Sequence, residues 1–196
     1  VKRALPGTEF GGRVIGTEEA LALEELPQSM VVVGAGASGV EIASAYARFG
    51  AAVTLLEGLD RVVPSEDADV SKAARRGFTK QGIDVHTSVF VESVRDAGDK
   101  VTYRHGDNEG EADSLVIAAG RAPDVAVLGL DKAGIELDES GLIKVDERLR
   151  TSREKVYAIG DLVPGPALAH KASDEGIIAV EDAAGEKTHP ISHANI

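Results

Sequence analysis

A glycine-rich segment carries the clearest chemistry in this sequence. Gly34, Gly36 and Gly39 have the spacing Gly-x-Gly-x-x-Gly, after an apolar run at 30–33 and before a stretch of helical composition. The first glycine permits a tight turn, the second lets a pyrophosphate approach the backbone, and the third lets helix and strand pack closely. The N–H groups at the helix start then face the phosphates. The spacing predicts a dinucleotide site; the alternative is a glycine turn that holds no ligand.

An acid ends the next apolar run. Glu57 follows residues 53–56, and an acid at that place can bind the ribose of a dinucleotide. Its carboxylate would accept hydrogen bonds from the ribose hydroxyls and repel a 2′-phosphate. Residues 58–60 include no arginine to receive such a phosphate. The sequence therefore favours NAD over NADP, with a solvated acid at a strand end as the alternative.

Three further polar residues each allow a functional and a structural interpretation. Glu41 lies near the start of the expected helix, where a surface acid is favoured by the helix dipole alone. Asp161 ends a short apolar run, where α/β sheets bind ligands, but aspartate is also common in turns and helix caps. His170 could be catalytic, although a lone histidine at a helix start is more often structural. The spacing of the other histidines indicates no metal site.

Composition limits the class of protein. The 196 residues are 43% hydrophobic and only 4% aromatic, and the net charge is −12. This acidity argues against binding to nucleic acid or to an anionic membrane. No apolar run approaches the ~20 residues of a membrane span and no signal peptide is evident, so we expect a cytoplasmic protein. The chain has no cysteine, which leaves no disulfide or thiol chemistry within it.

The order of elements predicts the fold class. Strands at 30–34, 53–57 and from 83 alternate with helices at 37–49 and from 65 to about 80, with Ser65 as the cap of the second helix. Strands at 89–94, 101–105 and 112–119, joined by polar turns, then suggest an antiparallel meander. Its last residues are apolar enough to return to the parallel sheet. We expect an α/β protein with a Rossmann-like parallel sheet and an antiparallel β-meander crossover.

The two ends of the sequence are less regular. A short helix at 17–21, capped by Thr17, precedes the first strand. After Pro123 a polar stretch leads to a short buried strand at 156–161 and a last helix at 168–184. The first residue is Val1 and the only methionine is Met30. We interpret both ends as cuts through a longer protein, with a complete small protein as the alternative.

Several segments together resemble the flavin-dependent disulfide reductases. The resemblance rests on the glycine loop 34–41, on 53–57, on 119–124 and on 156–161, which is similar to the second FAD motif of that family. Residues 168–172, followed by Glu175, narrow it to the dihydrolipoamide dehydrogenases. It extends from about residue 5 to residue 185.

The resemblance implies roles for particular residues, with no catalytic residue and no metal ligand among them. The residues implied to bind NAD are Gly34, Ala35, Gly36, Ala37, Ser38, Gly39, Val40, Glu41, Glu57, Val89 and Gly120. Glu41 would lie near the nicotinamide. The residues implied to bind FAD are Asp161, Ala167, Leu168, Ala169 and His170. His170 is then not the catalytic base of the family.

The departures from the family pattern are informative. The first FAD glycine motif, the redox cysteine pair and the catalytic His–Glu pair are all missing from this sequence, and Ala122 and Ala167 replace the more usual Arg and Met. The resemblance implies a lead-in from the FAD domain at 1–28, an NAD-binding domain at 29–121 and a returning part of the FAD domain at 122–196.

This organisation implies the central part of a dihydrolipoamide dehydrogenase. The parent would be a homodimer that reoxidises lipoyl domains of a 2-oxo acid dehydrogenase complex through a disulfide and FAD, reducing NAD. We expect the chain alone to be inactive. The alternatives are a non-catalytic NAD-binding or redox-sensing module, and another flavin disulfide reductase similar to mercuric reductase.

Overall fold

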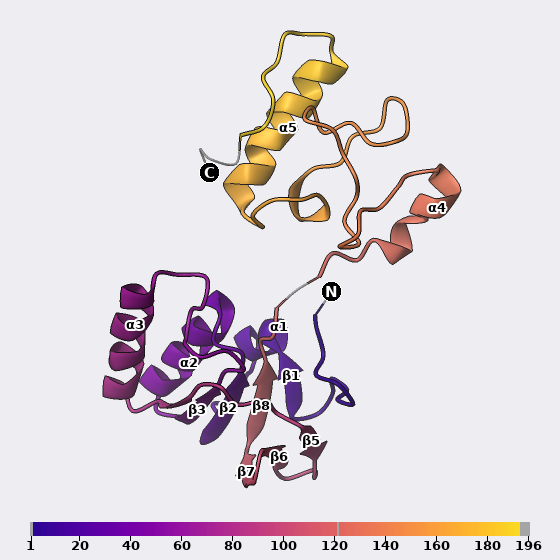
Figure 1. Cartoon of the computed structure of the whole chain (residues 1–196). Helices are drawn as coiled ribbons and strands as arrows, with labels where there is room; N and C mark the ends of the chain where they lie inside the picture. The colour runs from indigo at the N-terminus through magenta and orange to yellow at the C-terminus, as the bar shows by residue number, and fades with distance from the viewer. Residues whose placement is uncertain (1, 121, 193–196) are drawn as a thin grey trace. The chain divides into compact units, whose positions relative to one another are not determined.

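The structure, a computed structural model, describes residues 2–120 and 122–192 of the chain. These residues divide into two compact units, one comprising Lys2–Ala122 and the other beginning at Pro123 (Figure 1). Each unit has its own buried apolar clusters.

The Lys2–Ala122 unit is built around a five-stranded parallel sheet. The strand order is β1-β8-β2-β3-β4. The strands are β1 (Val14–Gly16), β2 (Ser29–Val33), β3 (Ala52–Leu56), β4 (Asp84–His86) and β8 (Ser114–Ile117). In the central strand Val32 pairs with Leu55 on one side and with Val116 on the other. Because β2 is buried on both faces, its residues are apolar without alternation, as the sequence predicted.

Different elements cover the two faces of this sheet. Alternate residues of a strand point to opposite faces, so Val32 packs with the helix α2 (Ala37–Phe49), while Val31 packs with the meander. The helices α1 (Thr17–Leu21) and α3 (Ala68–Lys80) also lie on the α2 face. Figure 1 shows the helices on one side of the sheet and the meander on the other. The parallel sheet and the meander confirm the predicted fold class.

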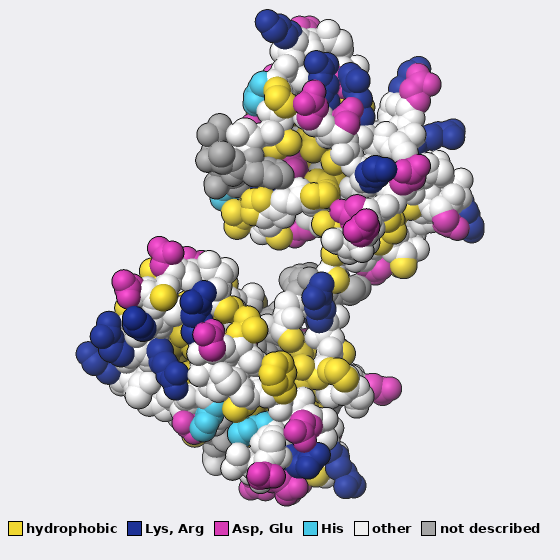
Figure 2. Space-filling model, viewed as in Figure 1, with side chains coloured by type: hydrophobic (Ala, Val, Ile, Leu, Met, Phe, Trp, Pro, Cys, Tyr) yellow, Lys and Arg dark blue, Asp and Glu magenta, His cyan; other side chains and the backbone are white. Residues whose placement is uncertain are grey.

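The outer face of α3 is basic. Lys and Arg side chains gather over this helix in Figure 2, and four of them border one shallow surface depression: Lys72, Arg75, Arg76 and Lys80. Lys72 Nζ lies 3.5 Å from Oδ1 of Asp69, which is in the first turn of the same helix. Acids at the start of a helix and bases toward its end are favoured by the helix dipole, which accounts for part of this pattern.

The meander consists of β5 (Ser93–Asp96), β6 (Val101–His105) and β7 (Asn108–Ala112). Two predictions were wrong here. The strand expected at 89–94 begins only at Ser93. The strand expected at 112–119 begins at Ser114 as β8, because Ala112 is the last residue of β7. His105 pairs with Asn108 across a two-residue turn in which Gly106 has φ +56°. The tight turn therefore leaves polar residues 108–111 to form a strand rather than a loop.

The start of the chain belongs to the same unit. Residues 14–16, for which no strand was predicted, form β1 and pair in parallel with β8. The N-cap of α1 is Gly16 and not Thr17, and the Glu19 carboxylate accepts a hydrogen bond from the Gly16 N–H at 2.9 Å. Helix α3 likewise begins at Ala68 rather than after Ser65, because residues 64–66 form a turn. From Lys2 onward, the expected lead-in 1–28 thus belongs to the same unit as the parallel sheet.

The second unit is mostly irregular in its described residues. It contains α4 (Leu130–Ala133), α5 (Ala169–Ala183) and two 3₁₀ helices, Ala126–Leu128 and Gly160–Leu162. The strand predicted at 156–161 was wrong, since Tyr157 makes only an isolated bridge with Arg150 and the chain enters the second 3₁₀ helix at Gly160. A φ of +75° at Gly160 ends the extended run.

Candidate functional site

A pocket of about 660 Å³ opens at the carboxyl ends of β2, β3 and β8. Ligands of parallel α/β sheets bind at this edge. The pocket brings together most of the residues predicted to bind NAD: Gly34, Gly36, Ala37, Ser38, Glu57, Val89 and Gly120. Of the remaining four, Ala35, Gly39 and Val40 are buried beside the pocket, and Glu41 is exposed elsewhere on α2.

The three glycines of the loop meet different surroundings. A Cβ atom on Gly34, which has φ +104°, would lie 2.6 Å from the carbonyl oxygen of Ala118. A Cβ atom on Gly39 would overlap the carbonyl oxygen of Gly34. A Cβ atom on Gly36 would meet no protein atom within 4 Å, although Gly36 lines the pocket. The fold therefore requires glycine at 34 and 39, whereas no protein atom requires it at 36, a position that lines the pocket.

The N-terminus of α2 adjoins that open space. Gly36 is its N-cap, no side chain caps the helix, and the first turn has no acid. The first N–H groups of an α-helix have no partner within the helix, and the helix dipole favours an anion there. In this unit the helix start, the open space at Gly36 and the pocket coincide. The arrangement fits a pyrophosphate bound by backbone N–H groups.

Glu57 is buried beneath the loop, with only 8% of its surface exposed. Its Oε2 accepts a hydrogen bond from the Ala35 N–H at 2.6 Å, and its Oε1 accepts one from the Leu59 N–H at 2.8 Å. Glu57 thus joins the glycine loop to the end of β3, a role that the sequence did not predict. Each carboxylate oxygen can accept a second hydrogen bond, so the pocket-lining Glu57 can still receive ribose hydroxyls.

Glu41 lies in a neighbouring groove rather than in the Glu57 pocket. This groove of about 520 Å³ runs between α1 and α2 and includes Glu41, Tyr46 and Ser38. Ser38 lines both the groove and the pocket. The two hollows therefore border the same residue at the start of α2.

The five residues predicted to contact FAD all lie in the second unit and are exposed: Asp161, Ala167, Leu168, Ala169 and His170. Leu168 is the N-cap of α5, and no side chain caps this helix. Asp161 lies in the 3₁₀ helix after Gly160. An exposed carboxylate and uncapped backbone N–H groups fit a group bound through hydroxyl and phosphate oxygens.

A buried ion pair positions the peptide next to Asp161. The side chains of Lys171 and Glu175 are 0% and 1% exposed, and Nζ lies 3.0 Å from Oε1. Lys171 Nζ also donates to the Gly160 carbonyl oxygen at 2.9 Å, and the Gly160 N–H donates to Glu175 Oε2 at 2.7 Å. The i,i+4 spacing in an expected helix was the available sequence signal, but it did not indicate burial.

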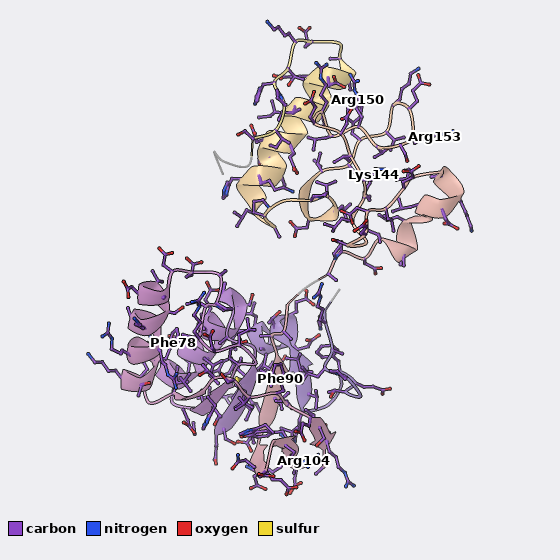
Figure 3. The ribbon with its side chains drawn as sticks, in the orientation of Figure 1. Phe78, Phe90, Arg104, Lys144, Arg150 and Arg153 are labelled. Carbon is purple, nitrogen blue, oxygen red and sulfur yellow. The ribbon has the colours of Figure 1, made fainter. Side chains whose placement is uncertain are left out.

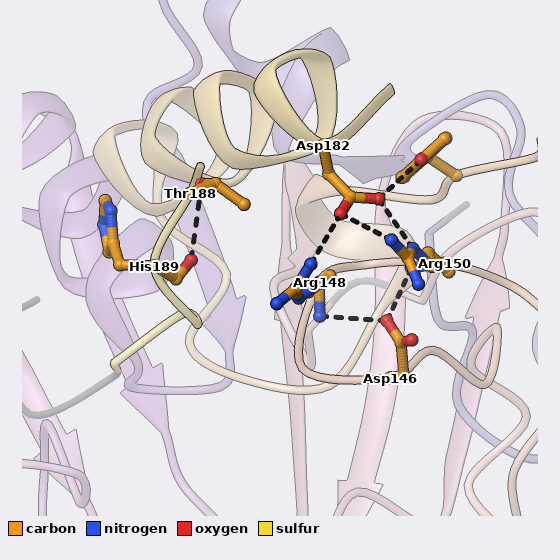
Figure 4. A network of polar contacts seen from close by, with 7 residues as sticks. Asp146, Arg148, Arg150, Asp182, Thr188 and His189 are labelled. Carbon is orange, nitrogen blue, oxygen red and sulfur yellow. Dashed lines mark hydrogen bonds and ion pairs between the residues drawn. The ribbon is translucent and has the colours of Figure 1, made fainter. Parts of the chain in front are cut away.

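A second polar cluster fixes the far end of α5 (Figure 4). Asp182 accepts hydrogen bonds from Arg150 Nε at 2.6 Å, Tyr157 Oη at 2.6 Å and Arg148 Nη1 at 3.2 Å. These donors, chiefly the Arg150 guanidinium, hold the pKa of Asp182 well below its ordinary value. The contacts connect α5 to the irregular segment 146–157, so we interpret the cluster as structural.

The described residues contain neither a cluster of metal-ligating side chains nor a helix that could span a membrane. Within residues 2–120 and 122–192, no group of three or more His, Cys, Asp or Glu side chains could hold a metal ion. Over the same part of the chain, no helix has the length and apolar character needed to cross a membrane.

Known proteins resemble this chain over almost its whole length. The model of the family described as pyridine nucleotide-disulphide oxidoreductase matches residues 2–176. Dihydrolipoyl dehydrogenase of Chlorobaculum tepidum is 43% identical over an alignment 196 residues long, gaps included, that covers 97% of this chain and 42% of that protein. Dihydrolipoyl dehydrogenase of Bacillus subtilis is 40% identical over 187 residues, covering 93% of this chain and 40% of that protein.

One solved structure is similar to this chain over its whole length. The HOCl-induced flavoprotein disulfide reductase of Escherichia coli matches with a TM-score of 0.89 at 30% sequence identity, covering 100% of this chain and 45% of that chain. The present chain spans about two fifths of the length of the curated relatives it matches.

Proposed function

Because the chain belongs to the pyridine nucleotide-disulphide oxidoreductase family, we propose that it is the NAD-binding portion of a flavin-dependent dihydrolipoyl dehydrogenase. The observation that carries this proposal is the pocket at Gly36, where the chain leaves space beside the uncapped start of α2. The pyrophosphate of NAD would occupy that space, and Glu57 would receive the hydroxyls of one ribose. The nicotinamide would extend past Ser38 toward Glu41.

The second unit would contribute to FAD binding in the parent enzyme. Asp161 and the backbone at 167–170 would contact the flavin cofactor, which supplies the two-electron chemistry between a disulfide and the nicotinamide. The chain has no cysteine, so the disulfide would have to come from another part of the parent. We therefore propose that the isolated chain binds NAD(H) and does not form NADH from dihydrolipoamide. Lipoyl domains and a second copy of the parent would be its partners.

A related disulfide reductase is the second candidate. It is favoured by the high structural similarity to the E. coli reductase. The curated relatives at 40% and 43% identity favour dihydrolipoyl dehydrogenase. Comparing lipoamide with other disulfide substrates on the full-length parent distinguishes the two candidates.

Titration of the chain with NADH and NADPH tests the cofactor proposal. We expect tighter binding of NADH, because the Glu57 carboxylate would repel a 2′-phosphate. Gly36→Ala should weaken NADH binding at least about tenfold, since its methyl group enters the space left for the pyrophosphate.

Gly77→Ala is the matched control for this titration. Gly77 lies in α3, and a Cβ atom there also meets nothing within 4 Å, but Gly77 is not part of the pocket. NADH affinity should therefore remain at the wild-type value. Equal affinity of the wild type for NADH and NADPH would contradict the assignment of Glu57, and equal NADH affinity of wild type and Gly36→Ala would contradict the site.

A further inference from the structure

We propose that Phe90 provides the surface on which the adenine ring of the dinucleotide stacks. This inference rests on the proposed function and adds to it a residue that neither the glycine motif nor the family resemblance indicated. Phe90 lies on the extended connection between β4 and β5, in the Lys2–Ala122 unit (Figure 3).

The backbone beside Phe90 is fixed to the end of β3. The Ser88 N–H donates to the Leu59 carbonyl oxygen at 2.7 Å, and the Val89 N–H donates to the Glu57 carbonyl oxygen at 3.0 Å. The connection is therefore held against the same strand end that carries the Glu57 carboxylate. This anchoring limits the positions that the Phe90 side chain can take.

Phe90 faces away from the core, unlike its neighbours. Val89 and Val91 pack against the apolar cluster on the meander face of the sheet. Phe90 lies between them with 71% of its surface exposed, and it lines the pocket. Phe78 of α3, by contrast, packs against the core. An exposed aromatic ring at a pocket edge is a surface that a flat apolar ligand can cover.

The absence of a side chain at Gly58 leaves room for the Phe90 ring. A Cβ atom on Gly58 would lie 2.7 Å from Cε1 of Phe90, so the ring extends over the backbone of Gly58. Gly58 directly follows Glu57 in the chain. The ring is thus next to the place proposed for the ribose.

The order of groups along the pocket matches half of a dinucleotide. The uncapped start of α2 suits the phosphates, Glu57 suits the adjacent ribose, and Phe90 follows on the side of Glu57 where Gly58 lies. The group attached to that ribose is a base. Stacking on an aromatic side chain is a recurrent way in which proteins bind bases without reading their sequence.

A unique tryptophan gives a direct test. The wild-type chain has no Trp, so Phe90→Trp places the only indole at this site. NAD and AMP should both quench its fluorescence, because both carry adenine, whereas nicotinamide mononucleotide should not. Quenching by nicotinamide mononucleotide but not by AMP would overturn the proposal.

Affinity measurements provide an independent test. Phe90→Ala should lower NAD affinity about tenfold, and Phe90→Leu should lower it nearly as much, because leucine keeps apolar bulk without an aromatic face. Val70→Ala removes another exposed apolar side chain, on α3 and outside the pocket, and should leave affinity unchanged. Phe90 is mostly exposed, so its variants should keep the wild-type thermal unfolding midpoint.

The outcomes separate this inference from the proposed function. If the wild type binds NAD and Phe90→Ala binds it equally well, the role of Phe90 is wrong and the NAD site stands. If the wild type does not bind NAD, both are wrong.

Discussion

The Lys2–Ala122 unit is built on buried apolar strands, whereas the unit that begins at Pro123 buries an ion pair, Lys171–Glu175, on its helix α5. In the first unit the backbone groups of the sheet pair with one another along the strands, as in the register of β2 with β3 and β8. In the second, the N–H and carbonyl groups of Gly160 pair with the side chains of Glu175 and Lys171. Irregular backbone must satisfy its buried polar groups in this way. The irregular backbone of the second unit around Gly160 therefore depends on a few polar contacts.

The largest expected effect comes from a substitution that breaks the buried ion pair of the second unit. Lys171→Met leaves the Glu175 carboxylate buried without its ion-pair partner and should lower the free energy of unfolding of that unit by about 3–5 kcal/mol. Native-state hydrogen exchange at the amides of α5, as a function of denaturant concentration, measures the loss.

Lys144→Met is the control in the same unit. Lys144 and Glu136 form an ion pair at 3.3 Å, but both side chains are about two-thirds exposed, at 65% and 64%. Breaking that pair should cost no more than about 1 kcal/mol. Equal effects of the two substitutions would show that burial of the Lys171–Glu175 pair does not matter.

A smaller effect is expected from a glycine of the first unit. Gly39→Ala places a methyl group against the carbonyl oxygen of Gly34 and should lower the free energy of unfolding of the Lys2–Ala122 unit by about 1–3 kcal/mol. Gly36→Ala should cost at most about 1 kcal/mol, because only its quality as an N-cap changes. Urea titration of the two variants separates the glycine needed by the fold from the one needed by the ligand; equal losses would contradict that distinction.

As the pH falls, the stabilisation by Asp113 in the first unit should be lost before the stabilisation by Asp182 in the second. In the first unit Asp113 accepts hydrogen bonds from Lys100 Nζ at 2.7 Å and from the Ser29 N–H at 2.8 Å, which lower its pKa from 3.8 to about 2. Because the folded-state pKa is lowered, Asp113 stabilises the unit fully above about pH 4, and this contribution is lost as the pH falls to about 2. The pKa of Asp182 in the second unit is lowered further, so its contribution persists to lower pH.

Unfolding of each unit as a function of pH measures this difference. Asp113→Asn should reduce the pH dependence of unfolding between pH 4 and pH 2 in the first unit only, since Asp96 and Glu19, whose pKa values are also lowered, remain there, and Asp182→Asn should alter the second unit only. An unchanged pH dependence of the first unit in Asp113→Asn would contradict the partners assigned to Asp113.

The sequence was informative where local patterns decide the structure. The apolar run before Gly34, the glycine spacing and the helix at 37–49 were all predicted, because each depends on neighbouring residues. Strand β1 was missed because three residues show no periodicity, and β7 because its residues are polar. The Lys171–Glu175 pair was not recognised as buried, since burial depends on how α5 packs against Gly160.

Within the site, the sequence identified the residue types but not all their contacts. Glu57 was predicted as a ribose ligand, and its hydrogen bond to the Ala35 N–H depends on the distance between two strand ends. Phe90 was not singled out because one aromatic residue between two valines resembles any apolar strand. Its exposure emerges only when Val89 and Val91 pack on the opposite side.

Hydrogen exchange of the chain with and without NADH tests the central claim most directly, namely that the dinucleotide binds at the glycine loop of the first unit. The account predicts slower exchange at the amides of residues 36–40 and 57–59, with residues 146–157 and helix α5 unchanged. Binding of NADH without protection of residues 36–40, or with protection confined to the second unit, would contradict it.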